Sequence, residues 1–342
     1  MGFLLSKLKF DVLFIDVTTP RPYETATLDT EGVGGTEASL IRVAEALGSL
    51  GLKVAVVEHN LKMELLGHSV YYLPISQIDN IEADHVIMLR GVQYADLFPK
   101  AFKYSWHQDV PTHLMLKMRD MFLQHDVTVV GVSKWHKGAI QSMVCKLDEL
   151  KNPNVTYIYN PVPDSLYVDK SVSVKYYPNK LVWPASPHKG LEYALELFKR
   201  LQELSKHKDW ELHVFNPGYA YKELIRAPNV VVHGAVPARE LWQHMSEALC
   251  VFYPTQFKET FGCIAAEANA VHCPVLTQEI AGLAETVASS NQYVKYDPKV
   301  IIDMVEDWRG GYRPKVHGQD RFRLSEIAVR WLKLFGKRER GE

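Results

Sequence analysis

One segment near the C-terminal end restricts the possible folds more than any other. The apolar residues 249–254 indicate a buried parallel strand. The alanine-rich residues 261–271 then indicate a helix that Gly262 opens, with Thr260 as its N-cap, and residues 274–277 indicate the next strand. A strand, a loop and a helix in this order place the helix N-terminus at the carboxyl edge of a sheet. The chain is therefore expected to have an α/β fold.

Two carboxylates flank the start of this helix. Glu259 precedes it, and Glu267 lies roughly 9 Å into it at ~1.5 Å per residue. Unpaired N–H groups and the helix dipole make a helix N-terminus suitable for an anion such as a diphosphate. A diphosphate there would leave a sugar near Glu259 and a ribose near Glu267, and carboxylates accept hydrogen bonds from such hydroxyls. The alternative is a helix with two surface glutamates.

With its flanks, E-T-F-G-C-I-A-A-E at residues 259–267 resembles the E-x7-E motif of retaining GT-B glycosyltransferases of the family 4, or glycosyl transferases group 1, type. The resemblance covers residues 11–335 and is densest in 249–287. It implies that Glu267 binds the nucleotide ribose and that Glu259, assigned as catalytic, contacts the donor sugar. Thr260, Phe261 and Gly262 are then expected to line the donor site.

Such a family implies two Rossmann-like domains that face a cleft. We expect residues 1–165 to form the N-terminal, acceptor-side domain and residues 166–316 the C-terminal, nucleotide-sugar domain. Residues 317–342 are expected to cross back onto the N-terminal domain. An amphipathic helix is indicated within residues 321–335, and a core helix of the C-terminal domain is the alternative.

Composition fits this architecture. A length of 342 residues allows about two domains, and 47% hydrophobic with 23% charged residues is typical of soluble globular proteins. The net charge of −1 gives no basic field for nucleic acid. Four cysteines without a C-x-x-C pair favour free thiols in a reducing compartment, so a cytoplasmic location is expected.

The N-terminal segment lacks the features of a signal peptide, and no apolar run of the chain reaches the ~18 residues of a membrane span. Gly2 and Ser6 match the short N-myristoylation pattern. A peripheral membrane contact through Phe3, Leu4 and Leu5 therefore stays open beside the simpler interpretation, a lead-in to the first strand.

A glycine loop, residues 32–37, follows the first predicted strand. It is a poor dinucleotide fingerprint because Glu37 occupies the third glycine position and more than a dozen residues separate the loop from the strand. It resembles the N-terminal glycine loop of the same glycosyltransferases. That implies that Gly34 and Gly35 approach the donor phosphate, with Thr36 and Glu37 on the acceptor side. The alternative is a turn with a helix cap.

An apolar strand at residues 102–106 ends in W-H-x-D-x-P, which places His107 and Asp109 at the carboxyl edge of a sheet, where open α/β folds bind ligands. The position is similar to that of a His or Asp that contacts the donor sugar in the family. We therefore include both residues among the catalytic candidates. Metal binding is the minor alternative, because no third ligand is evident.

Lys189 and Gly190 resemble a family Lys-Gly pair whose lysine contacts the donor diphosphate; an exposed lysine at a helix cap is the alternative. Val236 belongs to residues 232–236, which resemble the family's segment whose backbone contacts the nucleotide base. The chain departs from the family at Pro184, where an arginine is usual. Arg90 and Arg239 are weak candidates to replace it. It departs again at His272, where a glycine is usual, and this change is expected to affect a turn.

The resemblance implies transfer of a hexose from a UDP- or GDP-linked donor to the hydroxyl of a glycan or glycoconjugate. The anomeric configuration would be retained through front-face attack. No cofactor or metal is expected, since no D-x-D pair stands at a cleft position. Rival interpretations are a nucleotide-sugar epimerase, a phosphorylase and a catalytically silent partner subunit, while the glycine spacing disfavours an NAD enzyme. The sequence leaves open the donor base, the acceptor and the oligomeric state.

Overall fold

The computed structural model describes residues 7–59, 61–62, 65–146, 150–167, 175–215 and 227–339. The chain divides into two compact units. Unit 1 consists of Met1–Ala26, Gly35–Pro161 and Leu324–Glu342, and unit 2 of Thr27–Gly34 and Val162–Arg323. The N-terminal residues that leave a membrane contact open lie outside the described residues. No helix among the described residues is long and apolar enough to cross a membrane.

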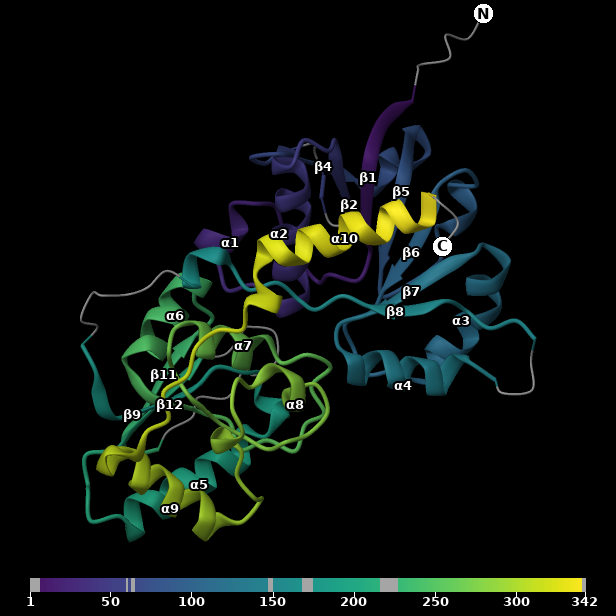
Figure 1. Cartoon of the computed structure of the whole chain (residues 1–342). Coiled ribbons are helices and arrows are strands. Elements are labelled where there is room, and N and C mark those ends of the chain that lie inside the picture. Colours follow the sequence, from purple (N-terminus) through teal and green to yellow (C-terminus); the bar gives the residue numbers. More distant parts are fainter. Residues whose placement is uncertain are drawn as a thin grey trace, which may run out of the picture. The chain divides into compact units, whose positions relative to one another are not determined.

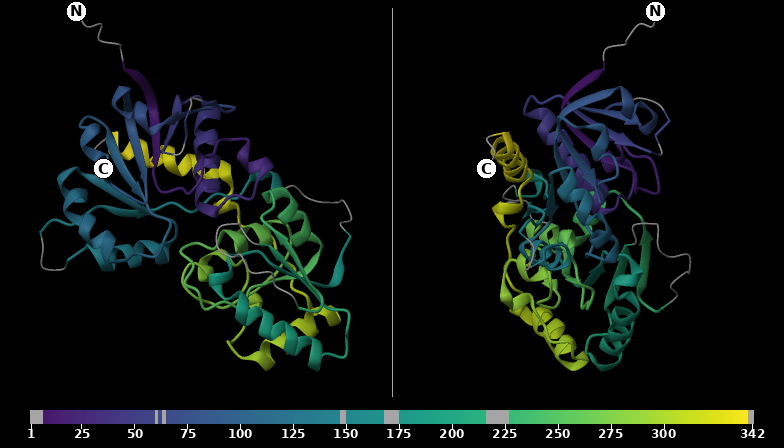
Figure 2. Two further views of the ribbon diagram at one scale, coloured as in Figure 1. Left: turned by 180° about the vertical axis from the view of Figure 1, so that it is seen from behind. Right: turned by 90° about the vertical axis from the view of Figure 1, so that its right-hand side faces the viewer.

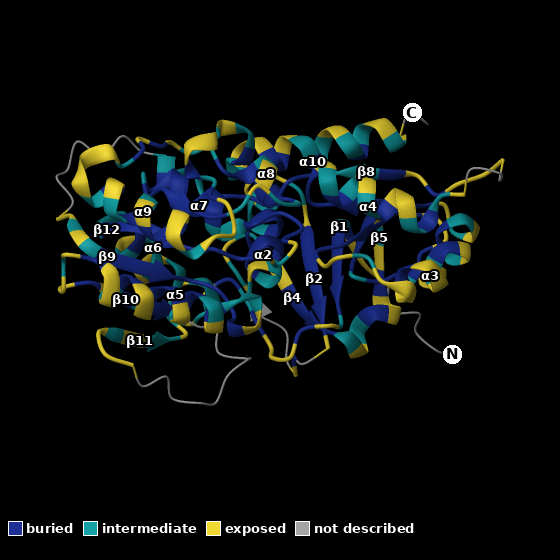
Figure 3. Ribbon diagram, turned by 90° about the horizontal axis from the view of Figure 1, so that it is seen from below, coloured by how far each residue is buried: buried dark blue, intermediate teal, exposed yellow. Residues whose placement is uncertain are grey.

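Unit 1 is built on an eight-stranded sheet in the order β3-β4-β2-β1-β5-β6-β7-β8. All neighbouring strands are parallel except β3 and β4. The second and seventh strands are buried along their whole length, and the first and fifth over their last five residues, as the dark blue ribbons in Figure 3 show. The strands are β1 (Leu8–Asp16), β2 (Val54–Glu58), β3 (Leu65–Leu66), β4 (Val70–Pro74), β5 (Ile81–Leu89), β6 (Phe102–Trp106), β7 (Val127–Gly131) and β8 (Val155–Tyr157).

The helices of unit 1 that precede the C-terminal segment are α2 (Gly35–Ser49), α3 (His113–Gln124) and α4 (Lys134–Val144). Short polar side chains cap two of them. The Thr112 hydroxyl accepts from the Leu114 N–H at the start of α3, and the Ser133 hydroxyl accepts from the His136 N–H at the start of α4. Short 3-10 turns, η1 (Ile75–Asn80) and η2 (Ala95–Leu97), complete the connections.

The C-terminal helix α10 (Leu324–Glu339) is part of unit 1 and packs against α2 and β6. Figure 1 shows it in yellow, and the rear view in Figure 2 shows it again beside the strands of this unit. Trp331 is fully buried, and its ring lies 5.3 Å from the ring of Trp106 on β6. Near the end of the helix, Arg338 donates to both the backbone carbonyl and the carboxylate of Asp126.

Unit 2 is built on a five-stranded parallel sheet in the order β11-β10-β9-β12-β13. Its strands are β9 (Tyr177–Trp183), β10 (Glu211–Phe215), β11 (Val230–Gly234), β12 (Ala248–Phe252) and β13 (Val275–Leu276). Its helices are α1 (Thr27–Thr30), α5 (Leu191–Leu204), α6 (Ala238–Glu247), α7 (Cys263–Ala270), α8 (Leu283–Thr286) and α9 (Pro298–Asp307). Shorter helical turns are η3 (Asp164–Tyr167), η4 (Pro187–Lys189), η5 (Ser290–Gln292), η6 (Trp308–Tyr312) and η7 (Asp320–Phe322).

The unit boundaries differ in detail from those expected from the sequence. Unit 1 ends at Pro161 rather than at residue 165, and the C-terminal return to it begins at Leu324 rather than at 317. Residues 27–34 belong to unit 2 although the sequence on both sides of them belongs to unit 1. Gly32 accounts in part for the assignment of this segment to unit 2, because its backbone packs closely against residues 235 and 236 of that unit. A Cβ on Gly32 would lie 2.8 Å from the Cβ of Ala235 and 3.1 Å from the amide nitrogen of Val236.

Candidate active site

The loop between β12 and α7 positions Glu259 at the carboxyl end of the unit 2 sheet. The helix begins at Cys263, two residues later than expected, and Gly262 occupies the cap position with φ 91°. The prediction of Thr260 as N-cap is therefore wrong. The left-handed backbone turns the chain into the helix, and glycine adopts it without steric cost. Glu267 lies in the middle of α7 and is buried.

Glu259 is held by two side chains that donate to the same oxygen. Lys189 Nζ lies 2.8 Å from Glu259 Oε1, and the Tyr253 hydroxyl donates to that oxygen at 2.6 Å. Glu259 is 9% exposed and Tyr253 is 1% exposed. Burial, and then the charge of Glu259, raises the pKa of Tyr253 well above its ordinary value, so its phenol remains a hydrogen-bond donor. The carboxylate is therefore charge-paired and fixed in direction.

The backbone around Glu259 is fixed by a close approach of Gly282. The Gly282 N–H donates to the carbonyl of Glu259 at 2.8 Å. A Cβ on Gly282 would lie 2.5 Å from the carbonyl oxygen of Thr260, closer than such atoms pack. Two residues beyond α7, His272 has a left-handed backbone with φ 60° in the turn that ends the helix, at the position where the resemblance predicted a changed turn.

Lys189 reaches Glu259 from the turn η4, which follows β9. Gly190, with φ 111°, ends that turn and starts α5. The Thr255 hydroxyl donates to the Lys189 carbonyl at 2.5 Å, and the Lys189 ammonium lies 5.0 Å from the ring centre of Phe257. Two segments far apart in sequence are thereby joined around one lysine. The family resemblance predicted a diphosphate contact for Lys189; its partner in the structure is Glu259.

Glu267 accepts a hydrogen bond from a residue that the sequence did not single out. Trp242 on α6 donates its indole N–H to Glu267 Oε2 at 3.0 Å. The indole nitrogen is a donor only, so this contact fixes one oxygen of the Glu267 carboxylate. Fixing one oxygen also orients the second oxygen of the same group. Trp242 and Tyr253 thus each donate a hydrogen bond to one of the two glutamates of the motif.

In unit 1, Arg90 contacts side chains that follow two strands and side chains from the first turn of α2. Its guanidinium donates to Asp109 Oδ2 at 2.6 Å, to the Thr18 hydroxyl at 2.9 Å and to the Thr36 hydroxyl at 2.7 Å. It also lies 3.6 Å from Glu37 Oε1. Burial raises the pKa of Glu37, and the charge of Arg90 opposes this rise. Arg90 therefore organises residues predicted for the acceptor side, together with Asp109.

The same edge carries a buried carboxylate that the sequence analysis missed. Asp16, the last residue of β1, is fully buried. Its Oδ1 accepts from the backbone and hydroxyl of Thr18, both at 2.8 Å, and its Oδ2 accepts from the Tyr23 hydroxyl at 3.0 Å. Burial, and then the Asp16 charge, raises the pKa of Tyr23 well above its ordinary value. An aspartate at a strand's carboxyl end was the signal that could have indicated it.

His107 and Asp109 lie in different environments, because His107 is buried and the Asp109 side chain is exposed. His107 is 6% exposed, and its Nε2 lies 2.8 Å from the Ser105 hydroxyl. Because that hydroxyl donates to the carbonyl of Gly91, His107 Nε2 carries the proton. Burial, and then the neighbouring His136, lowers the pKa of His107 to about 3. The Asp109 side chain is instead 69% exposed and pairs with Arg90, so the two predicted residues form no direct hydrogen-bonded pair.

The glycine loop is divided between the units. Gly34 ends the segment that belongs to unit 2, whereas Gly35 is the first residue of α2 in unit 1. Thr36 and Glu37 lie in the first turn of α2, and both contact Arg90. Val236 follows β11, next to Gly32 of the loop. Gly34 and Val236 are thus parts of one unit, and the predicted acceptor residues belong to the other.

Comparison with known proteins supports the fold. Residues 182–308 match the family model described as Glycosyl transferases group 1. AviGT4, a glycosyltransferase involved in avilamycin A biosynthesis, is 16% identical, with a TM-score of 0.65 over 97% of this chain and 99% of that one. HepE of Anabaena, solved with UDP and glucose, is 12% identical, with a TM-score of 0.68 over 96% of this chain and 100% of its own.

A third similar structure is WaaG, a glycosyltransferase involved in lipopolysaccharide biosynthesis. It is 14% identical, with a TM-score of 0.61 over 94% of this chain and 95% of that one. No curated protein sequence matches the chain significantly. The chain is therefore an α/β protein with the GT-B glycosyltransferase fold, and its residues 182–308 match glycosyl transferases group 1.

Proposed function

We propose that this protein is a retaining glycosyltransferase that moves a hexose from a UDP- or GDP-linked donor to the hydroxyl of a glycan or glycoconjugate. The observation that carries the proposal is the arrangement at α7. Glu259 is paired with Lys189 and Tyr253 just before the helix, and Glu267 is held by Trp242 within it. This set of residues falls inside the segment that matches the family model.

Unit 2 is the proposed donor unit. The N-terminus of α7 and Lys189 would stabilise the diphosphate, whose negative charge increases as its bond to the sugar breaks. Glu267 would accept hydrogen bonds from the ribose hydroxyls, and Glu259 from the donor sugar. Tyr253 donates to Glu259 and Trp242 donates to Glu267, and these two contacts would orient the carboxylates toward the hydroxyls that they bind.

Unit 1 is the proposed acceptor unit, with Thr36 and Glu37 among its contacts. Retention is proposed to proceed by front-face attack. The acceptor oxygen forms a bond to the anomeric carbon, the bond to the diphosphate breaks, and the acceptor proton passes to the departing phosphate. His107 would position the sugar rather than remove a proton. This role fits a neutral imidazole whose Nε2–H is committed to Ser105.

The charge supplied by Lys189 and α7 supports a reaction without a catalytic metal, which is part of the proposal. The test is turnover of UDP- and GDP-hexoses with a panel of glycan acceptors by wild type and Glu259→Ala, each in buffer containing EDTA. Transfer by wild type alone, with the product anomer retained by NMR, supports the proposal. Near-normal turnover by Glu259→Ala, or inversion of the anomer, contradicts it.

A further inference from the structure

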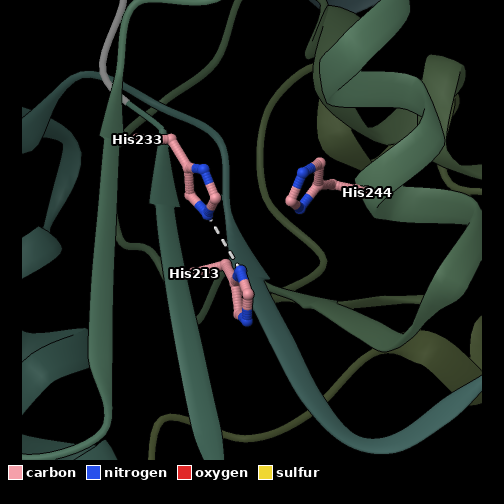
Figure 4. Close-up of side chains that lie close together, drawn as sticks. All are labelled: His213, His233 and His244. Carbon is pink, nitrogen blue, oxygen red and sulfur yellow. Dashed lines mark hydrogen bonds between the residues drawn. The ribbon is translucent and has the colours of Figure 1, made fainter.

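Three histidines on one side of the unit 2 sheet form a cluster that the proposed reaction does not use. His213 comes from β10, His233 from the neighbouring strand β11, and His244 from helix α6, as Figure 4 shows. One ring nitrogen of each lies within 4.8 Å of the others. Within the described part of the chain, no other group of three or more His, Cys, Asp or Glu residues has this geometry.

The protonation pattern of the first pair leaves a lone pair directed into the cluster. His213 Nε2 lies 3.3 Å from Glu211 Oε2, so this nitrogen carries the proton that the carboxylate accepts. His213 Nδ1 is then a lone-pair nitrogen, and it lies 2.9 Å from His233 Nε2. Carboxylates commonly orient metal-binding histidines by accepting from the other ring nitrogen in this way. Without a metal, His233 Nε2–H donates to His213 Nδ1.

The third imidazole has a buried nitrogen without a partner. His244 Nδ1 is inaccessible to solvent and makes no hydrogen bond. Its ring is held by aromatic contacts, 4.6 Å from the ring of His233 and 4.9 Å from that of Phe215. A buried polar atom without a hydrogen bond destabilises the folded protein, so a native structure that keeps one calls for an explanation such as a bound ion.

Burial is the largest of the causes that lower the pKa values of His213, His233 and His244, the last to about 4. The ammonium of Lys180 on β9 contributes to each shift and would repel a cation, but Glu247 pairs with it at 2.9 Å. The carboxylate of Glu211 adds a further negative charge beside the cluster.

We propose that His213, His233 and His244 bind a divalent transition-metal ion of the Zn²⁺ class through three imidazole nitrogens, with solvent as the fourth ligand. Imidazole is a preferred ligand of Zn²⁺, at about 2.0–2.1 Å in tetrahedral geometry, which sets ligand nitrogens roughly 3.3 Å apart. In the structure, His213 Nδ1 and His233 Nε2 lie 2.9 Å apart and the three ligand nitrogens lie within 4.8 Å of one another, so rotation of these partly buried rings would have to bring the nitrogens to that spacing. On metal binding, the proton of His233 would move from Nε2 to Nδ1, so that His233 Nε2 and His213 Nδ1 both offer a lone pair to the ion while His213 keeps its proton on Nε2.

Such an ion would fix α6 to the edge of the sheet. His244 lies on the same helix as Trp242, which donates to Glu267. The ion would therefore stabilise the position of the helix that supports this glutamate. The metal proposal itself does not depend on the proposed function, because its evidence is the histidine cluster alone.

The test uses the full-length protein, freed of metal with a chelator and then dialysed. Zn²⁺ binding is measured by calorimetry, and Co²⁺ is used as a spectroscopic probe, since tetrahedral Co²⁺ absorbs visible light far more strongly than octahedral Co²⁺. We expect one ion per chain, a visible Co²⁺ spectrum, and a rise in melting temperature with Zn²⁺. His244→Ala and His213→Ala should lose all three signals, whereas His317→Asn, a change of an exposed histidine in the same unit, should keep them.

Glu211→Gln tests the site in a variant that is expected to fold normally, because the Glu211 side chain is 49% exposed. It removes the carboxylate that orients His213, and we expect Zn²⁺ affinity to fall about 10–100-fold with the circular dichroism spectrum unchanged. The proposal is overturned if Zn²⁺ binds equally to wild type, His244→Ala and Glu211→Gln. It is also overturned if Zn²⁺ and Co²⁺ do not bind wild type, in which case the rings are only an aromatic stack around Phe215.

Discussion

Replacing Glu259 by glutamine should strengthen the binding of a nucleoside diphosphate while it removes sugar transfer. Lys189 is assigned to the donor diphosphate under the proposed function, yet its ammonium pairs with Glu259 in the structure. A diphosphate that recruits this lysine must weaken the pair. A nucleoside diphosphate lacks the sugar, so it loses no contact when the Glu259 charge is removed, and it gains a lysine that is easier to recruit.

The size of the effect follows from the exposure of the pair. The Lys189 and Glu259 side chains are 26% and 11% exposed, so the pair is neither fully screened nor fully buried. Exposed pairs contribute up to about 1 kcal/mol. Glutamine keeps an acceptor oxygen for Tyr253 and Lys189, so mainly the charge is lost. We expect a gain of about 1 kcal/mol, or roughly five-fold tighter binding.

Lys189→Ala measures how much the lysine contributes to the binding of a nucleoside diphosphate. A hydrogen bond to a charged group contributes about 1.5–3 kcal/mol, so this variant should bind a nucleoside diphosphate about 10- to 140-fold more weakly. Calorimetry with UDP, GDP and ADP measures the single variants and the double variant. If Lys189 carries the effect, Glu259→Gln should change nothing in the Lys189→Ala background.

Glu279→Gln serves as the control for a change of net charge, because Glu279 is an exposed residue of the same unit. It should leave affinity unchanged. Two results would refute the reasoning. Unchanged affinity in Lys189→Ala would mean that the lysine stays with Glu259 and never reaches the diphosphate. Weaker binding by Glu259→Gln would mean that the carboxylate itself supports the nucleotide.

Three further predictions test the surroundings of the site. Trp242→Phe removes the donor to Glu267 and should weaken nucleoside diphosphate binding by about 0.5–1.5 kcal/mol in calorimetry; equal affinity would show that Glu267 needs no such support. Trp331→Ala empties a fully buried position under α10 and should lower the free energy of unfolding by about 3–5 kcal/mol in urea, whereas a change below 1 kcal/mol would contradict the packing of this helix. The depressed pKa of His107, about 3, means that between its unfolded value of ~6.5 and pH 3 only the unfolded chain binds this proton, so stability falls as pH falls through this window. His107→Asn should reduce that slope by up to about 1.4 kcal/mol per pH unit in urea titrations at pH 4–6.5, and an unchanged slope would show that His107 is protonated in the folded protein.

The motif at residues 259–267 could be located from the sequence because its signals are local. An apolar run, a glycine and an alanine-rich stretch follow one another, and each limits the backbone over a few residues. The exact helix start could not be predicted, since Thr260 and Gly262 both suit a cap position. The structure selects Gly262 with φ 91°. The close approach of Gly282 to the Thr260 carbonyl accompanies that choice, and it depends on packing across the loop.

The partners of the two glutamates and of Arg90 could not be predicted, because they depend on strand order. Arg90 follows β5, which lies between β1 and β6 in the sheet. β6 is also the next strand in the sequence, but β1 is not the strand that precedes β5. This order brings Thr18 and Asp109 to the same guanidinium. Tyr253, although only six residues before Glu259, has a hydroxyl whose direction the sequence pattern does not specify.

The charges around Glu259 connect the departure at Pro184 with the behaviour expected of Lys189. Lys189 and Glu259 neutralise each other, so the pair alone offers no net attraction for a diphosphate. Pro184, where the family resemblance predicts an arginine, offers no cation. The helix N-terminus of α7 contributes only about half a positive charge. Under the proposed function, a donor diphosphate therefore gains most if Lys189 turns from the carboxylate to the phosphate as it binds, which would leave Glu259 to the sugar. On this argument, the pair holds both side chains in place in the empty site, and donor binding separates their tasks.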